Sequence, residues 1–261
     1  MSALPTIFVS HGAPTLAIEP SPARDFLVAL GRDIDARFGR PAAVVAVSAH
    51  WETSVPAASI AASPATIHDF GGFPDQLHRM RYAAPGAPTT AQEVVRRLTA
   101  AGVEATTDRD RGLDHGAWVP LCLMYPDADV PVTQLSVQPS RDPRHHHRIG
   151  EALRPLREEG VLLLGSGSIT HNLRELSARP AEEAPHVRQF VDWIAERAAA
   201  GDAASLLDYR RLAPHAERNH PTDEHLLPLF VVLRAAASQR LRRIHASVTF
   251  GSLRMDAFEA D

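Results

Sequence analysis

The stretch Ala42-Ala43-Val44-Val45-Ala46-Val47-Ser48-Ala49-His50-Trp51 carries the clearest signal for the fold, since it is an apolar run that ends at a histidine. Short apolar runs bounded by Gly, Pro or polar residues are typical of buried strands. Four other runs share this character. The expected strands are Thr6 to Ser10, Ala42 to Ser48, Val130 to Leu135, Val161 to Gly165 and Ile244 to Phe250.

Amphipathic stretches alternate with these runs and predict helices. The expected helices are Ala23 to Arg37, Thr89 to Ala101, Pro143 to Glu159, Pro185 to Ala200 and Glu224 to Ala236. Alternation of strands and helices predicts an α/β fold, here a single domain over residues 1–261 with a central, largely parallel or mixed sheet flanked by helices. Between Trp51 and Pro88 the chain is rich in Pro, Gly, Ser and Ala without a helical period, which indicates a long functional loop.

The composition narrows the chemistry. All 27 basic residues are arginine, which excludes lysine-based Schiff-base, pyridoxal-phosphate and P-loop mechanisms. Cys122 is the only cysteine, so the chain has no internal disulfide and no thiolate metal cluster. The net charge of -4 gives no basic footprint for nucleic acid or an anionic membrane, and a small-molecule partner fits better. We expect a cytoplasmic protein, because no signal-peptide pattern or membrane-spanning apolar run occurs.

Histidines, 14 in all, occur where strands are expected to end. His11 follows the apolar run Ile7-Phe8-Val9, and His50 follows the run quoted above. His171 comes just after the turn Gly165-Ser166-Gly167-Ser168. The crevice beyond the carboxyl ends of strands is the usual ligand site of an open α/β sheet, so these imidazoles are expected to converge there.

A fourth histidine, His225, lies in Pro221-Thr222-Asp223-Glu224-His225. With Thr222 as the N-cap, His225 falls in the first turn of a helix, where a neutral imidazole is favoured and can bind metal. Glu224 is a rival ligand, but adjacent helical positions point about 100° apart, which favours one of the two for a single ion.

Other histidines have weaker signals. The run His145-His146-His147 is interpreted as a solvated helix start after Pro143. His115, in the turn-like sequence Asp114-His115-Gly116, and His68, on the long loop, are candidates to line a substrate pocket.

The segments that carry these residues appear in a characteristic order. They are Val9-Ser10-His11-Gly12-Ala13-Pro14, Val47-Ser48-Ala49-His50-Trp51, Ile67-His68-Asp69-Phe70-Gly71-Gly72-Phe73-Pro74, Asp114-His115-Gly116, Ser166-Gly167-Ser168-Ile169-Thr170-His171-Asn172-Leu173 and Pro221-Thr222-Asp223-Glu224-His225. Together they resemble the class III extradiol ring-cleaving dioxygenases, in the 4,5-DOPA dioxygenase-like branch. The resemblance extends from Ile7 to about Leu253.

The resemblance implies an enzyme that opens the aromatic ring of a DOPA-like catechol with O2. By that resemblance His11, His50 and His225 are the metal ligands, His171 is the acid/base beside the substrate, and His115 is a further active-site histidine. His68 and Trp51 are expected to contact substrate. One departure is Asp223, where bacterial members of the branch usually carry proline, and it concerns the shape of the loop and the fit of the substrate.

The residues alone do not determine which metal is bound or which reaction is catalysed. A site of histidine ligands with open positions suits the Fe(II) needed for the reaction, while Zn(II) binds such ligands more tightly and is expected in purified protein. One alternative is a zinc hydrolase that activates water, and another is a binding protein on the same fold. A serine nucleophile at Ser166 or Ser168 is less favoured, because the Gly-x-Ser-x-Gly elbow is absent.

Overall fold

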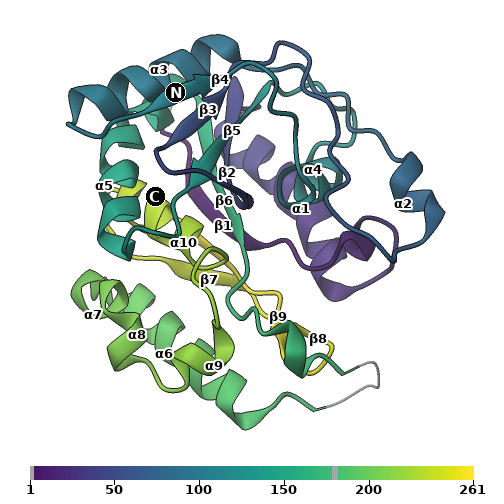
Figure 1. Ribbon diagram of the computed structural model, residues 1–261, viewed down its shortest axis with the longest axis vertical. Coiled ribbons are helices and arrows are strands. Elements are labelled where there is room, and N and C mark those ends of the chain that lie inside the picture. Colours follow the sequence, from purple (N-terminus) through teal and green to yellow (C-terminus); the bar gives the residue numbers. More distant parts are fainter. Residues whose placement is uncertain (1–2, 178–181) are drawn as a thin grey trace.

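A mixed eight-stranded sheet forms the centre of the computed structural model, which describes residues 3–177 and 182–261 (Figure 1). The strand order is β4-β3-β5-β2-β6-β1-β10-β7, with β5, β2, β6 and β1 parallel and β3 and β10 antiparallel to their neighbours in that group. The strands of this sheet are β1 (Thr6–Ser10), β2 (Ala43–Glu52), β3 (Ala57–Ser59), β4 (Thr106–Asp108), β5 (Val132–Val137), β6 (Val161–Gly167), β7 (Arg242–His245) and β10 (Ala257–Ala260). The prediction of an α/β fold with a mixed sheet is confirmed.

Helices cover both faces of the sheet (Figure 1). One face packs against α1 (Pro22–Phe38) and α4 (His115–Met124), and the other against α3 (Pro88–Ala100), α5 (Pro143–Leu153) and α10 (Leu227–Ala235). The remaining elements are α2 (Asp75–Arg79), α6 (Pro185–Ala200), α7 (Ala203–Leu207), α8 (Tyr209–Leu212), α9 (Ala216–Asn219), the 3-10 turns η1 (Pro14–Ala17), η2 (Arg154–Glu159) and η3 (Leu173–Glu175), and the ribbon β8 (Val248–Thr249) with β9 (Leu253–Arg254).

A hydrophobic core lies on each face of the sheet, because side chains alternate between the two faces along the strands. Val45 and Val47 of β2 pack in the core that contains α5 and α10, whereas Val44 and Ala46 pack in the core of α1 and α4. Both sets are buried, because successive residues of a strand point to opposite faces. A central strand buried on both faces is a continuous apolar run, which explains why the sequence signal of β2 is so clear.

The carboxyl-terminal strand prediction is wrong in its extent. The stretch Ile244 to Phe250 is divided between β7, which ends at His245, and β8, which ends at Thr249. Phe250 adopts a φ of 53°, which turns the chain from β8 into β9. No local sequence pattern predicts that β10 pairs with β1, because the two strands are more than 240 residues apart in the chain.

Two local predictions also need correction. The sequence around His115 is not a turn, because Asp114 caps α4 by accepting a hydrogen bond from the Ala117 amide, and His115 is the first residue of that helix. The helix start after Pro143 is confirmed, but His145 and His146 are buried rather than solvated. The first turn of α5 packs them under the β5 end of the sheet, where Gln138 contacts both rings.

The buried His146 predicts a measurable pH dependence of stability. Its Nδ1 donates to the Asp142 carbonyl (3.2 Å) and its Nε2 accepts from the Gln138 amide (3.0 Å), so the neutral ring is satisfied. Burial lowers the pKa of His146 to about 4, from 6.5 in an unfolded chain. Between these values the unfolded chain binds more protons, so this contribution is full above pH 6.5 and is lost as the pH falls towards 4, by roughly 3 kcal/mol in total.

Urea unfolding of the wild type and of His146→Gln between pH 4 and 7.5 measures this contribution. The glutamine oxygen can still accept from Gln138 but does not titrate, so the variant should lose less stability on acidification. Equal pH slopes for the two proteins would show that His146 does not contribute.

Within the described residues, no helix combines the length and the apolar character needed to cross a membrane.

Candidate metal centre and active site

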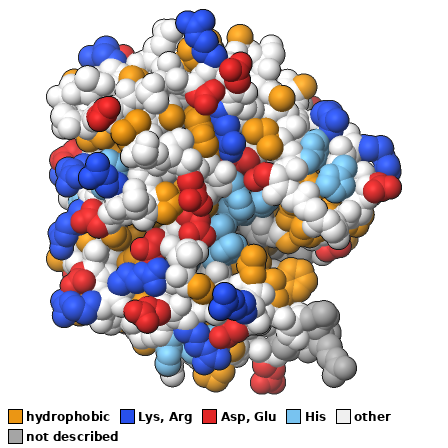
Figure 2. Space-filling model, in the orientation of Figure 1, with side chains coloured by type: hydrophobic (Ala, Val, Ile, Leu, Met, Phe, Trp, Pro, Cys, Tyr) orange, Lys and Arg blue, Asp and Glu red, His pale blue; other side chains and the backbone are white. Residues whose placement is uncertain are grey.

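Three imidazoles meet at the carboxyl edge of the parallel strands. His11 directly follows β1 and His50 lies near the end of β2, and these two strands flank β6. The Nε2 atoms of His11 and His50 are 3.0 Å apart, and those of His225 and His50 are 3.3 Å apart. Figure 2 shows histidine side chains gathered in a hollow on this face of the molecule. The predicted convergence of these side chains is therefore present in the fold.

His225 reaches the cluster from a turn rather than from a helix. The helix α10 begins at Leu227, with Pro228 in its first turn, so the expected start at Glu224 and the expected Thr222 N-cap are wrong. The turn is fixed instead by the Leu226 and Leu227 amides, which donate to the Asp223 carbonyl. A proline is favoured in the first turn of a helix, and here it delays the start past His225.

Gly167 at the end of β6 lets this turn lie directly against the sheet. A β-carbon at Gly167 would stand 2.0 Å from the His225 carbonyl oxygen, so only glycine allows this approach. The next amide, that of Ser168, donates to the same carbonyl at 2.9 Å. Asp223 anchors the other side of the turn through the Tyr209 hydroxyl at 2.6 Å and through Arg210. Asp223, the residue that departs from the bacterial pattern, thus fixes the position of the loop through these two contacts.

Each of the three converging imidazoles has an oxygen beside its second nitrogen. His11 Nδ1 lies 3.0 Å from the Ser166 hydroxyl, and His225 Nδ1 lies 2.8 Å from Glu224 Oε1. His50 Nδ1 lies 3.6 Å from Asp69 Oδ2. Oxygen atoms in these places favour the proton on Nδ1 and leave the Nε2 lone pairs facing one another. Lone pairs that face one another repel unless a cation lies between them.

The separations fit a metal ion. Imidazole nitrogens at about 2.1 Å from an ion, with bond angles of about 90–109°, lie about 3.0–3.4 Å from each other. The two Nε2 separations in the cluster, 3.0 and 3.3 Å, fall in this range. The group His11, His50 and His225 could therefore hold one ion. Two further groups of possible ligands share a residue with it, namely His50, Asp69 and His115, and His171, Glu224 and His225.

Burial keeps the cluster neutral. Burial first, and then the neighbouring imidazoles, lower the pKa of His11 and of His225 well below the usual 6.5. Burial and the nearby His115 lower the pKa of His50 to about 4. Neutral imidazole is the form that binds metal, so the cluster is in its binding form at neutral pH.

His171 and His115 flank the cluster. The His171 ring stacks on His225, with ring centroids 3.3 Å apart, and Glu224 Oε1 lies 3.9 Å from its Nδ1. Burial lowers the pKa of His171 to about 4. His115 Nδ1 lies 2.9 Å from Asp69 Oδ1, which also accepts from the His115 amide. Among the described residues none forms a hydrogen bond with the His171 ring, which leaves that ring available to a ligand.

A cavity of about 260 Å³ opens beside these residues. Its histidine wall is formed by His11, His50, His115 and His171, with His225 behind them. Its other walls are mostly apolar, with Phe70 and Phe73 supplied by the long loop after Trp51. The predicted functional loop thus contributes directly to the site, although it also contains the short elements β3 and α2.

Some expected site residues lie elsewhere. His68 contacts the Met80 carbonyl and Arg81, and Trp51 is buried with the Arg111 guanidinium 5.1 Å from its ring. Neither is among the residues that line this cavity. Ser166 is fully buried, which excludes it as an accessible nucleophile. Asp69, which follows His68 in the quoted motif, contacts both His50 and His115, and no pattern in the sequence alone indicates this role.

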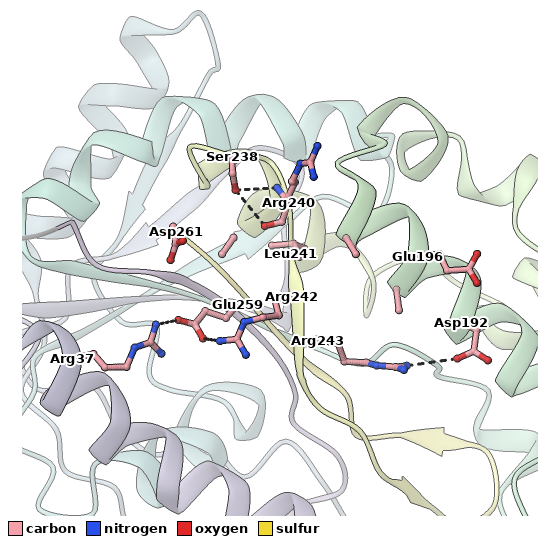
Figure 3. A pocket seen from close by; sticks show the side chains of 13 residues that line it. Arg37, Asp192, Glu196, Ser238, Arg240, Leu241, Arg242, Arg243, Glu259 and Asp261 are labelled. Carbon is pink, nitrogen blue, oxygen red and sulfur yellow. Dashed lines mark hydrogen bonds and ion pairs between the residues drawn. The ribbon is translucent and has the colours of Figure 1, made fainter.

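A larger cavity of about 830 Å³ lies away from the histidines, between α6 and the strands β7 and β10. Five of its charged side chains form ion pairs with one another, as Figure 3 shows for Glu259 between Arg37 and Arg242 and for Arg243 beside Asp192. Its described lining includes no histidine or cysteine, so it offers no soft-metal or imidazole chemistry. We interpret these ion pairs as structural.

The fold and the histidine cluster together define an α/β protein with a site able to hold one metal ion beside a small apolar cavity. Residues 4–253 match the family model described as the catalytic LigB subunit of aromatic ring-opening dioxygenase. The chain belongs to this family, and it is a non-haem, metal-dependent aromatic ring-opening dioxygenase, an oxidoreductase that uses O2 and a small catechol.

Curated relatives agree over nearly the whole chain. The chain is 42% identical to a 4,5-DOPA dioxygenase extradiol of Beta vulgaris, over 93% of this chain and 91% of the relative. It is 36% identical to a protein of the same description from Escherichia coli K12, over 97% of this chain and 93% of the relative. The crystal structure of an uncharacterized Escherichia coli K12 protein matches with a TM-score of 0.82 and 31% identity, covering 99% of this chain and 100% of that one.

Proposed function

We propose that this chain, as one catalytic domain over residues 1–261, is an extradiol dioxygenase that opens a catechol ring at an iron(II) ion held by His11, His50 and His225. The observation that carries the proposal is the pair of Nε2 separations, 3.0 and 3.3 Å, beside a cavity of about 260 Å³. When bound, iron(II) supplies the redox chemistry that lets dioxygen react with an aromatic ring. Zinc fits the same ligands and is expected to compete for them.

Glu224 supports the assignment of His225 as the third ligand. Its Oε1 lies 2.8 Å from His225 Nδ1 and 3.0 Å from the Thr222 hydroxyl, on the side of the ring away from the shared Nε2 atoms. A carboxylate in this position orients the imidazole and raises its basicity. Glu224 therefore acts behind the ligand in this proposal.

The other residues handle protons and exclude water. His171 lines the cavity as a neutral imidazole, so it can accept a proton from a catechol hydroxyl and return it to the product. Asp69 fixes a proton of His115 on Nδ1, which leaves the His115 Nε2 lone pair as an acceptor towards the substrate. Phe70 and Phe73 form an apolar wall that keeps water away from the reacting ring.

Anaerobic loading with iron(II), followed by exposure to catechols and air-saturated buffer, tests the function. We expect oxygen uptake and a yellow ring-opened product with iron, and none with zinc alone. No turnover across a broad panel of catechols would refute the proposal. Zinc-dependent hydrolysis that survives removal of oxygen would favour the alternative of a hydrolase.

A further inference from the structure

Two kinds of side chain dominate the lining of the cavity. Four of the lining residues are the histidines His11, His50, His115 and His171. The large remaining side chains are apolar, namely Phe70, Phe73, Leu173, Leu176, Phe250 and Leu253, and Phe70 packs directly against His115. Such a lining predicts a ligand whose few polar atoms meet the histidines and whose remainder is apolar.

The described lining contains no arginine, aspartate or glutamate. The Ser168 hydroxyl does line the cavity, but it donates to the Thr170 carbonyl at 2.7 Å. The two carboxylates beside the histidines are already engaged, because Asp69 accepts from the His115 amide and ring and Glu224 contacts His225 Nδ1. A charged group between the buried parts of these walls would lose hydration and meet no counter-charge in the described lining, and such burial is costly.

The apolar lining continues to the protein surface. Leu173, Leu176 and Phe250 are 58%, 38% and 38% exposed, and they are three of the five large hydrophobic residues that the described part of the chain exposes. Exposed apolar side chains clustered at a cavity mouth are typical of a binding site for apolar groups.

We propose that the substrate is a single-ring catechol with a short apolar substituent, and that a charged amino-acid side chain is disfavoured. This inference rests on the proposed dioxygenase function. The two hydroxyls would lie against the histidines and the substituent between the aromatic and aliphatic side chains. A cavity of about 260 Å³ lies just below the usual range of roughly 300–1,000 Å³ for ligand sites, which fits one ring and few further atoms.

The experiment compares 4-propylcatechol with L-DOPA, whose substituents have similar length but differ in charge. For the iron-loaded enzyme we expect kcat/KM to favour 4-propylcatechol at least about tenfold, because a small change of substituent is worth about 10- to 200-fold in an apolar pocket. Anaerobic titration calorimetry on zinc-loaded protein should show the same order of affinity without turnover.

A pair of arginine variants provides a matched control. Leu173→Arg places a guanidinium at the mouth, and it should raise kcat/KM for 3-(3,4-dihydroxyphenyl)propionate relative to 4-propylcatechol by about tenfold. Leu212→Arg changes a residue that is 40% exposed on α8 and does not line the cavity, so the ratio should not change.

The outcomes separate the two proposals. If the wild type turns over neither of these two catechols nor any other catechol of the panel, the dioxygenase function fails. If it prefers L-DOPA in both turnover and binding, the function stands and the inference about the substrate is overturned. An unchanged ratio in Leu173→Arg would also count against the placement of the substituent.

A different observation concerns the helix α4, which contains Pro120. In a regular helix the amide of residue 120 would donate to the carbonyl of Gly116, but proline has no N–H. The Ser166 hydroxyl of β6 donates to that carbonyl instead. Since the hydroxyl hydrogen is used there, Ser166 must accept at its contact with His11 Nδ1, 3.0 Å away.

We infer that Ser166 is a positioning residue, which fixes the proton of His11 on Nδ1 and so keeps the Nε2 lone pair for the metal. Pro120 makes this possible because it leaves the Gly116 carbonyl free. In Ser166→Ala, zinc and iron(II) affinity should fall by about 10- to 100-fold, as is typical when such a partner is lost. Ser136→Ala, which removes a buried hydroxyl of β5 that contacts Thr53 and the Ala57 amide and no histidine, should bind both metals normally.

Nitrogen-15 NMR of the histidine rings in metal-free protein gives a readout that a merely structural role would not change. We expect His11 to be in the Nδ1–H form in the wild type and to become a mixture of tautomers in Ser166→Ala. A wild-type His11 protonated on Nε2 would overturn the inference even if the variant failed to fold. Unchanged metal affinity in a folded Ser166→Ala protein would do the same.

Discussion

Replacement of His225 by glutamine is expected to abolish stoichiometric metal binding and to lower turnover at least about 1,000-fold. A bound ion stabilises the transition state by several kcal/mol, and each 1.36 kcal/mol is worth about tenfold in rate. His225 Nε2 lies 3.3 Å from His50 Nε2, and no other described side chain has a nitrogen at this third position of the cluster. Metal content by elemental analysis and oxygen uptake on the same samples measure the effect.

Glu224→Gln is the matched control, since Glu224 is the chemically plausible rival. Its carboxylate contacts His225 Nδ1 at 2.8 Å, so its loss should weaken metal binding by only about 10- to 100-fold and leave a loaded, active enzyme at saturating metal. The reverse result, with metal lost in Glu224→Gln and kept in His225→Gln, would make Glu224 the ligand.

Replacement of His171 by glutamine is expected to lower turnover by about 100- to 10,000-fold while the metal content stays that of the wild type. This range is typical for loss of a general acid or base. The ring lines the cavity and stacks on His225 with centroids 3.3 Å apart, but it is not part of the group formed by the three Nε2 atoms. Steady-state oxygen uptake and metal analysis separate the two effects.

His245→Gln serves as the control for a general effect of losing an imidazole. His245 lies on β7, stacks on Phe26 and contacts the Ser247 hydroxyl, away from the cavity. It should keep normal turnover. Loss of metal from His171→Gln would instead assign His171 as a ligand, and normal turnover of that variant would exclude it as the acid/base.

Together these two experiments divide the cluster into residues that hold the ion and a residue that moves protons. This distinction also bears on the alternative hypothesis that the same side chains form a zinc hydrolase. A zinc hydrolase would also lose activity when a ligand is removed, but its reaction would not require oxygen. Oxygen dependence in the wild type is therefore measured alongside both variants.

Local sequence patterns were enough to predict the strands that are buried on both faces and the residues at their ends. The run before His50 predicts β2 because every position of a doubly buried strand must be apolar, and β1 and α6 agree with their predicted bounds. Local spacing also indicated that His11 and His50 leave strands at the same edge. Such signals are local, since a few neighbouring residues suffice to produce them.

The way in which distant segments combine at the site could not be predicted from local patterns and is visible in the folded chain. The strand order β2-β6-β1 places Ser166 between His11 and His50, and Gly167 lets the His225 turn lie against β6. Asp69 joins the site from the long loop, which has no periodic pattern to reveal its position. These contacts depend on strand order and close packing between segments far apart in the chain, and no local pattern of residues encodes either one.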